Sequence, residues 1–273
     1  MKVQVLIVAG FLVGLSYSAK GQDSLNLFQR WGKTMKVRAV EGSKENNSYR
    51  ISGIGLSGAQ VQDTKMAPNI YSGLGAGASL GWFNMHSKHQ TLVDMEFTYN
   101  SLSFSETGGN DYSSMRAAFL ISHSRFLNPK NPRWLLGGSL LAADGYRQNG
   151  YLGNSAEHND LIIALQPRIG YQNERSILRR EAFWFANFGV DLLAYLNRIP
   201  EYNLDGATSY IRPVGGFNHF RFDVGFSRAM RFSENRFGME YSWDFYGYNE
   251  MEGLHKTRSA QHLITLNWWF KTR

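Results

Sequence analysis

Charged side chains recur two residues apart at several places in the chain, and this spacing could do chemistry on one face of an extended strand. Asp94 and Glu96 form one such pair, and Arg221 and Asp223 form another. Residues i and i+2 of a strand point to the same side, so each pair presents its charges together. Nine residues lie on the polar side of alternating segments: Asp94, Glu96, Arg116, Arg168, Asp191, Arg221, Asp223, Glu240 and Asp244. Such a set can form arginine–carboxylate ion pairs, or it can line a narrow polar path or a small-ligand cavity.

A second set of residues could activate a water molecule. Glu157, His158 and Asp160 lie close together, and Asp144 and Asp205 could add carboxylates from neighbouring segments. His158 and Asp160 can share a face where a strand begins and could polarise a water. The alternative is a solvated loop end, where charged residues are expected in any case. We therefore expect His158→Ala and Asp160→Asn to leave folding and phenotype unchanged.

The sequence contains no serine–histidine pair that is placed for nucleophilic catalysis on one strand. A dyad on one strand needs the serine and the histidine at i and i+2, because neighbouring residues point to opposite faces. In Ser122, His123 and Ser124 the two residue types are adjacent. Ser87 and His89 have the required spacing, but they fall in a short turn. The chain has no cysteine, which excludes a thiol nucleophile.

The sequence also offers no metal or cofactor site. Of seven dispersed histidines, only His86 and His89 are close, and no carboxylate is near them in sequence. Asn203, Asp205 and Gly206 could contribute oxygen ligands, but they lack the spacing of an EF-hand calcium loop. We predict neither a metal nor a cofactor.

The elements that must position these residues have a period of two. Apolar and polar side chains alternate through residues 236–248 and again through residues 217–232. Such segments are longer than the strands of soluble proteins, which average about 5–6 residues, and they suit a tilted membrane-spanning strand of roughly 9–11. We expect strands near residues 48–59, 69–83, 89–103, 113–126, 134–146, 159–173, 180–196, 217–231, 236–248 and 259–270.

The spacing and the ends of these strands carry two further patterns. From residue 84 onward the predicted connections alternate between short and long, as expected when tight turns lie on one side of a membrane. Aromatic residues cluster at the strand ends: Trp82, Phe126, Trp134, Tyr171, Trp184, Phe232, Phe237, Trp268 and Trp269 near the short turns, and Tyr99, Tyr112, Tyr146, Tyr195 and Tyr248 near the long loops. Two aromatic bands around an apolar belt are typical of a transmembrane barrel.

With these patterns the chain resembles a bacterial outer-membrane β-barrel protein of the small, porin-like kind. The resemblance covers residues 48–273 as a pattern, and His262–Phe270 is similar to the aromatic-ended closing strand of that class. Here Lys271, Thr272 and Arg273 follow Phe270. The resemblance implies an all-β fold, a transmembrane antiparallel up-and-down barrel of about ten strands (eight to twelve possible), in a Gram-negative outer membrane.

In a barrel of this size the nine charged residues face a lumen that is too narrow for a wide pore, so we expect an arginine–carboxylate network across it. Glycines 73, 75 and 77 would leave room inside or allow curvature. The implied partners are outer-membrane lipids and the barrel-assembly machinery. Some barrels of this class are enzymes, either omptin-type proteases or lipid-cleaving barrels, but the motif of neither is recognisable.

The N-terminus is typical of an exported precursor. Lys2 precedes an apolar stretch at residues 3–15, and Ala19 and Gly21 supply small residues before a cleavage site. We divide the chain into a signal peptide (residues 1–21), a periplasmic arm or short helix (22–45) and an outer-membrane β-barrel (46–273).

The charge pattern does not favour nucleic-acid binding. The formal net charge is +7, and the basic residues are scattered, with no long basic run. The sequence therefore favours an outer-membrane barrel with a structural, binding or narrow-pore transport role and without catalysis. The alternatives are a barrel hydrolase acting on lipid or peptide at the extracellular rim, and a soluble secreted β-rich binding protein.

Overall fold

The computed structural model describes residues 47–64, 67–104, 112–149, 157–177, 180–200, 208–213, 217–231, 233–250 and 255–272. The chain divides into two units, Met1–Ser43 and Lys44–Arg273, and all the described residues belong to the second. The predicted signal peptide and the predicted arm or helix of residues 22–45 lie outside the described residues and stay predictions. Among the described residues there is no long apolar helix of the kind that spans a bilayer.

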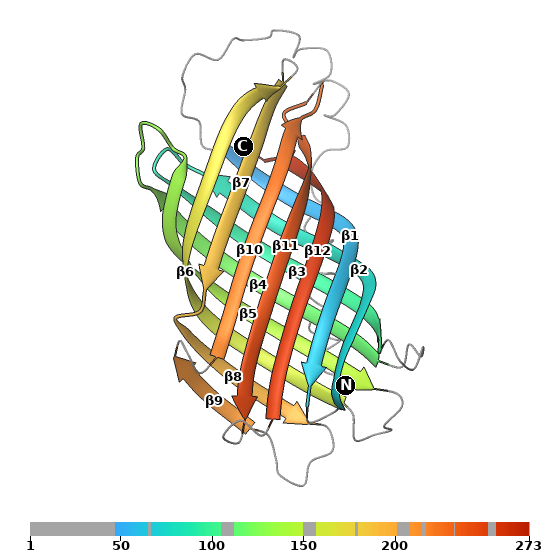
Figure 1. Cartoon of the computed structure of the whole chain (residues 1–273). Coiled ribbons are helices and arrows are strands. Elements are labelled where there is room, and N and C mark those ends of the chain that lie inside the picture. The colour runs from blue at the N-terminus through green and yellow to red at the C-terminus, as the bar shows by residue number, and fades with distance from the viewer. Residues whose placement is uncertain are drawn as a thin grey trace, which may run out of the picture. The chain divides into compact units, whose positions relative to one another are not determined.

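The described residues form twelve strands in one antiparallel sheet (Figure 1). Their bounds are β1 Asn47–Asp63, β2 Ala67–Met85, β3 His89–Ser103, β4 Tyr112–Phe126, β5 Trp134–Asn149, β6 Glu157–Ile177, β7 Arg180–Val190, β8 Leu193–Pro200, β9 Thr208–Pro213, β10 Phe217–Ala229, β11 Arg236–Glu250 and β12 His255–Lys271. The sheet order is β5-β4-β3-β2-β1-β12-β11-β10-β7-β6-β8-β9. An additional pairing between β5 and β6 closes the sheet into a barrel.

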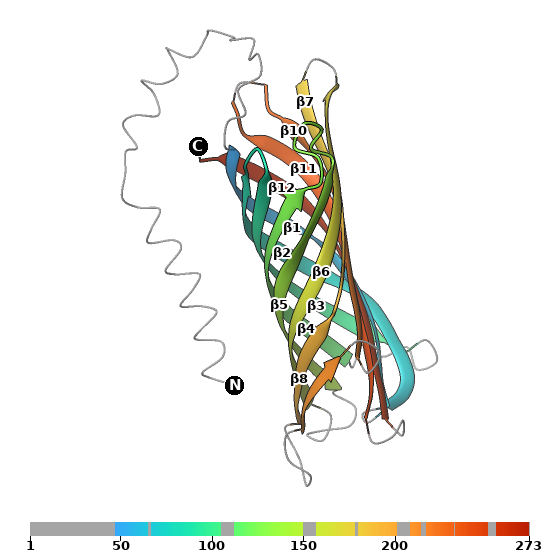
Figure 2. The ribbon, with the colours of Figure 1, turned by 90° about the vertical axis from the view of Figure 1, so that its left-hand side faces the viewer.

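Two pairs of these strands each act as one strand of the barrel wall. β6 pairs with β7 through residues 168–177 and with β8 through residues 158–165, so β7 and β8 follow each other along the same edge. In the same way, β10 pairs with β7 and β9 pairs with β8, so β9 and β10 also act as one strand of the wall. Figure 2 shows β8 and β9 at the opposite end of the barrel from β7. The wall therefore has ten strands, which confirms the predicted all-β antiparallel barrel.

Side-chain alternation gives the barrel an apolar outside and a largely polar inside. On β11, Phe237 is exposed, whereas Asp244, at a position of the other parity, is buried. On the neighbouring strands β1 and β2, Leu56 is 74% exposed and Leu74 is 79% exposed. Because a protein surrounded by water rarely exposes an apolar surface of this extent, the outer face fits a lipid environment.

The strands run further than the sequence alternation indicated. At the end where the chain enters β1 and leaves β12, called the terminus end below, the connections are residues 86–88, 127–133, 178–179 and 230–235. At the opposite end, called the far end, they are residues 64–66, 104–111, 150–156, 201–207 and 251–254. The two sets overlap in length, so the predicted alternation of short and long connections is wrong. The β8–β9 hairpin, for example, fills most of the longest predicted connection.

The two aromatic bands on the outer face also contain fewer residues than predicted. Trp82, Trp134 and Trp184 lie exposed on the outside. Four residues assigned to the bands instead point inward and are buried: Phe126, Trp269, Tyr112 and Tyr248. Closeness to a strand end sets the height of a side chain along the barrel, but its parity along the strand decides whether it faces in or out.

Glycines allow β1, β2 and β3 to approach one another closely at one corner of the barrel. A Cβ atom at Gly75 of β2 would lie 1.7 Å from the carbonyl oxygen of Tyr99 on β3. One at Gly77 would lie 2.5 Å from a side chain of β12. Across the corner, Oγ of Ser57 on β1 donates to Oδ1 of Asn100 on β3 at 2.7 Å. Both interpretations of these glycines, interior room and strand curvature, are consistent with this geometry.

Apolar side chains pack the interior at both ends of the barrel. At the terminus end the packed side chains are Tyr49, Ile51, Phe83, Phe183 and Trp269. A second group, on β4, β5, β6, β8 and β11, includes Leu120, Leu141, Ile162, Leu196 and Tyr246. A third, at the far end, contains Ala59, Val61, Leu102 and Tyr112. Charged and apolar side chains therefore share the interior of the barrel.

The barrel interior as a candidate functional site

The structure places all nine predicted charged residues on the inward face of the wall. Six of them are buried: Arg116, Arg168, Asp191, Arg221, Asp223 and Asp244. Asp94, Glu96 and Glu240 are half-buried. The nine come from β3, β4, β6, β10 and β11 and from the break between β7 and β8. Parity explains this convergence for the eight residues on strands, because each lies at an inward-facing position of its strand.

Arg221 of β10 connects the carboxylates on one side of this cluster. Its Nη1 and Nη2 donate to the two carboxylate oxygens of Glu96 at 2.9 and 2.7 Å, and its Nε donates to Asp223 at 2.9 Å. Asp223 also accepts from Arg168, and Asp94 lies 3.6 Å from Arg221. A bidentate arginine–carboxylate contact has a specific geometry, so it fixes the position of β3 relative to β10 across the barrel.

His219 connects the other side of the cluster. Its Nδ1 and Nε2 each lie 3.0 Å from a carboxylate oxygen, of Asp191 and Asp244 respectively. Asp244 also pairs with Arg116 at 2.9 Å, and Asp191 accepts from Gln166 at 2.7 Å. These contacts join four elements of the wall around one imidazole. Sequence reasoning did not select His219, although it lies two residues before Arg221 on the same inward face.

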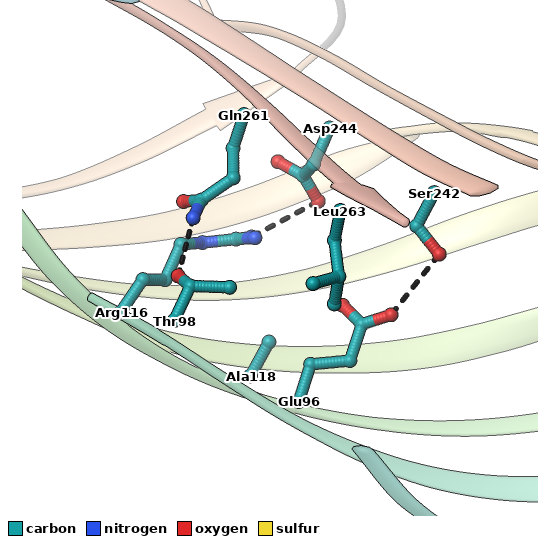
Figure 3. A pocket seen from close by; sticks show the side chains of 8 residues that line it. All are labelled: Glu96, Thr98, Arg116, Ala118, Ser242, Asp244, Gln261 and Leu263. Atoms are coloured by element: carbon teal, nitrogen blue, oxygen red, sulfur yellow. Dashed lines mark hydrogen bonds and ion pairs between the residues drawn. The ribbon is translucent and has the colours of Figure 1, made fainter. Parts of the chain in front are cut away.

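Very little space remains between these side chains. A cavity of about 10 Å³ lies beside Glu96, Arg116 and Asp244 (Figure 3). Another of about 30 Å³ lies between Trp269 and Glu240, next to the aromatic layer. Since one water molecule needs roughly 10–15 Å³ measured in this way, the two cavities hold a few waters at most. Neither of these two cavities therefore has room for a solute between the charged groups.

A second charged cluster lies at the far end and was missed by sequence reasoning. Arg147 of β5 pairs with Asp160 of β6, and its Nη1 lies 3.5 Å from Asp63 of β1. Arg198 of β8 pairs with Asp63 at 2.5 Å. The hydroxyl of Tyr248 donates to Asp160 at 3.3 Å. Two arginines and two aspartates thus balance one another in a buried layer.

The residues considered for water activation do not form an open site. His158 and Asp160 share the inward face, but both are buried, and Asp160 is only 1% exposed. The solvated loop end expected for them is wrong, because β6 extends past both residues and buries them against arginines. Because Asp160 is buried against Arg147, we now expect Asp160→Asn to destabilise the barrel. Glu157 bonds to Gln148 at the surface.

The other two carboxylates of that set do not join the buried pair. Asp144 lies on β5 as the Cα partner of Leu161, and it is half-buried. Asp205 lies outside the described residues. Among the described residues, the carboxylates of this set do not converge on one site.

The histidines and serines at the terminus end form no serine–histidine dyad on β4, although three histidine rings lie close together. Ser122 and Ser124 are buried while His123 between them is exposed, so no serine–histidine dyad forms on β4. The rings of His86 and His89 lie 4.5 Å apart, and those of His89 and His123 lie 5.2 Å apart. No group of three histidine or acidic residues within the described ranges is arranged to hold a metal ion.

Comparisons with known proteins find distant likenesses to solved structures. No protein-family model and no curated protein matches it. The outer-membrane protease OmpT of Escherichia coli is 11% identical, with a TM-score of 0.49 over 86% of this chain and 100% of that one. The translocator domain of the autotransporter NalP from Neisseria meningitidis is 8% identical, with a TM-score of 0.40 over 88% and 94%. The toluene transporter TodX of Pseudomonas putida is 8% identical, with a TM-score of 0.25 over 84% and 90%. These three proteins differ in activity, and the likeness to each is too distant to transfer an activity to this chain.

Proposed function

We propose that this protein is an integral outer-membrane β-barrel whose interior is closed and which serves as a structural or binding component. The observation that carries the proposal is the filled interior. The Arg221–Glu96 and Arg116–Asp244 contacts link opposite walls, and the cavities beside them measure only about 10 and 30 Å³. Opening a path would require separating buried ion pairs, and breaking one such pair costs about 3–5 kcal/mol.

The apolar outer face supports the membrane part of the proposal. Leu56 and Leu74 are exposed on β1 and β2, and Ile54 and Met239 are exposed in the same way on β1 and β11. A soluble secreted protein would expose these side chains to water at a large cost. Lipid contact removes that cost, and the closed sheet satisfies the backbone hydrogen bonds of the wall.

The burial of His158 and Asp160 disfavours the hydrolase alternative. An acid–base pair must reach a substrate or its water, and these two side chains contact Arg198 and Arg147 instead. No contact among the described residues favours a catalytic role over a structural one.

Two measurements test the proposal. Fractionation of the cells, with heat-modifiable migration on a detergent gel, should find a folded barrel in the outer membrane. Recovery in the soluble periplasmic fraction would refute the membrane assignment. Planar-bilayer recordings of the refolded protein should show no large stable channel, and a persistent conductance of porin size would refute the closed interior.

A further inference from the structure

The rim of the terminus end carries four basic residues between β2 and β5, with no acidic residue in the segments that hold them. Lys88 lies in the β2–β3 turn, Arg125 near the end of β4, and Lys130 and Arg133 in the β4–β5 turn; we call these four residues the basic rim. All four are exposed. The segments that hold them, residues 81–90 and 121–136, contain no aspartate or glutamate.

The backbone holds the two turns of the basic rim together. The amide of Phe126 donates to the carbonyl of Lys88 at 3.0 Å, which ties the β2–β3 turn to the end of β4. The amide of Leu127 donates to the carbonyl of Trp134 at 2.9 Å and closes the β4–β5 turn. The positive charges are therefore carried by fixed backbone positions, which lowers the entropic cost of binding an anion.

Histidine side chains extend the basic rim along the outer wall. Arg125 lies opposite His89 in the β3–β4 register, and His123 lies two residues earlier on the same outward face. His123 Nδ1 is 3.0 Å from Thr91 Oγ1, which orients the ring. Imidazole groups beside lysine and arginine add hydrogen-bond donors where a phosphate could approach from the lipid side.

On the opposite half of the same rim, two basic residues are paired with carboxylates. Lys271 pairs with Glu234 at 3.0 Å, and Arg236 lies 3.6 Å from Glu181. In contrast, no described carboxylate lies within ion-pair distance of the four residues of the basic rim. The four positive charges of the basic rim are therefore not offset by nearby carboxylates among the described residues.

The neighbouring tryptophans set the depth of the basic rim. Trp82 on β2 and Trp134 on β5 flank it and are each about half exposed on the outer wall. Tryptophans of a membrane protein lie at the level of the lipid headgroups. We propose that the basic rim binds the phosphate groups of anionic phospholipid headgroups, an inference that rests on the proposed membrane location.

Competition between two lipids tests this proposal. The purified, folded full chain is incubated in detergent with equal amounts of phosphatidylglycerol and phosphatidylcholine, and the bound lipids are counted by native mass spectrometry. The test variant is Arg125→Gln/Arg133→Gln. The matched control is Lys256→Gln/Arg258→Gln, which removes two exposed charges from β12 at the far end.

We expect the wild-type protein to retain phosphatidylglycerol preferentially. The test variant should lose about 25-fold of that preference, because each of the two removed basic residues contributes about a fivefold factor near an anionic surface. The control should keep the preference. Equal retention of both lipids by the wild type, or an equal loss in both variants, would refute the proposal. Full displacement of the bound lipid by inorganic phosphate would also refute it, since the ligand would then be a soluble anion.

The same samples separate this proposal from the broader one. A barrel that migrates heat-modifiably and inserts into vesicles but shows no lipid preference overturns only the basic-rim proposal. A chain that enters no vesicle of either lipid overturns the membrane assignment itself.

Discussion

Nδ1 of His219 lies 3.0 Å from Oδ2 of Asp191, and the amide of Asp191 donates in turn to the carbonyl of His219 at 3.1 Å. Asp191 directly follows β7, at the point where the pairing of β6 passes from β7 to β8. Two contacts from a single residue of β10 therefore hold the break in the wall in place. A break of this kind is a local irregularity that needs side-chain support.

Replacement of His219 should destabilise the barrel. The variant His219→Ala leaves Asp191 and Asp244 each without one hydrogen-bond partner in a buried site, so we expect the free energy of unfolding to fall by about 2–4 kcal/mol. Urea titration of the refolded protein in vesicles, followed by tryptophan fluorescence, measures this change.

The matched control for that measurement is His262→Ala. His262 makes one side-chain hydrogen bond, with the Tyr241 hydroxyl at 2.8 Å, and does so on the exposed outer face. Its loss should cost about 1 kcal/mol or less. Equal effects of the two histidine variants would contradict a supporting role of His219 in the interior.

Removal of the Asp160 carboxylate should destabilise the barrel, because this group pairs with Arg147 in the buried far-end cluster. Asp160→Leu leaves Arg147 buried without its closest partner, and we expect a loss of about 3–5 kcal/mol. The double variant Arg147→Met/Asp160→Leu should recover most of it, because the remaining Arg198–Asp63 pair is still balanced. Denaturant unfolding of both variants gives the comparison.

Glu157→Gln is the surface control for this series. Glu157 bonds to Gln148 at the exposed end of the same strand pair, so its replacement should change stability by only about 0.5 kcal/mol. If the double variant proved no more stable than Asp160→Leu alone, the charges of this cluster would not act as a balanced set.

Alanine at position 75 should block assembly of the corner formed by β1, β2 and β3. The new Cβ would lie 1.7 Å from the Tyr99 carbonyl oxygen, and backbone on β3 cannot move aside without breaking the β2–β3 pairing. We expect Gly75→Ala to lose most of its heat-modifiable band. Gly58→Ala, whose Cβ would be 3.5 Å from the Leu74 side chain, should fold normally. Normal folding of both variants would show that the corner is less tight than described.

Tryptophan quenching tests which face of the wall meets lipid. In a variant that retains only Trp82, which is 51% exposed on the outer wall, brominated lipids should quench the fluorescence strongly. In a variant that retains only Trp269, which is 4% exposed in the interior, they should quench it weakly. Similar quenching of the two would mean that the inward and outward faces have been assigned incorrectly.

Much of the fold follows from the two-residue period of the sequence. Asp244 and Phe237 lie on opposite faces of β11 because their positions differ in parity, and this rule holds wherever the hydrophobic alternation is clear. The same rule gives the inward direction of each charged residue but not its partner. That Arg221 meets Glu96 rather than another carboxylate depends on the curvature of the whole wall, which no local pattern encodes.

The far-end cluster was missed because the predicted strands stopped too early. The inward face of β5 runs through Leu141 and Ala143 and continues to Arg147, one residue past the predicted end of that strand. Arg198 lies two residues past the predicted end of its own segment. Polar residues at a strand end resemble loop residues in hydrophobicity. The signal that could have identified Arg147 and Arg198 was the two-residue alternation of inward and outward positions, which continues past the last apolar residue.

The contact between Glu96 and Arg221 spans 125 positions of the chain and joins walls that meet only through the closed sheet. A partly assembled sheet therefore has to hold both charges without partners beside apolar surroundings. Pairing of β1 with β12 and neutralisation of the interior then become a single late event, and its rate should be limited by this non-local encounter. We therefore expect a barrel closed in the wrong register to hold unmatched buried charges and to reopen.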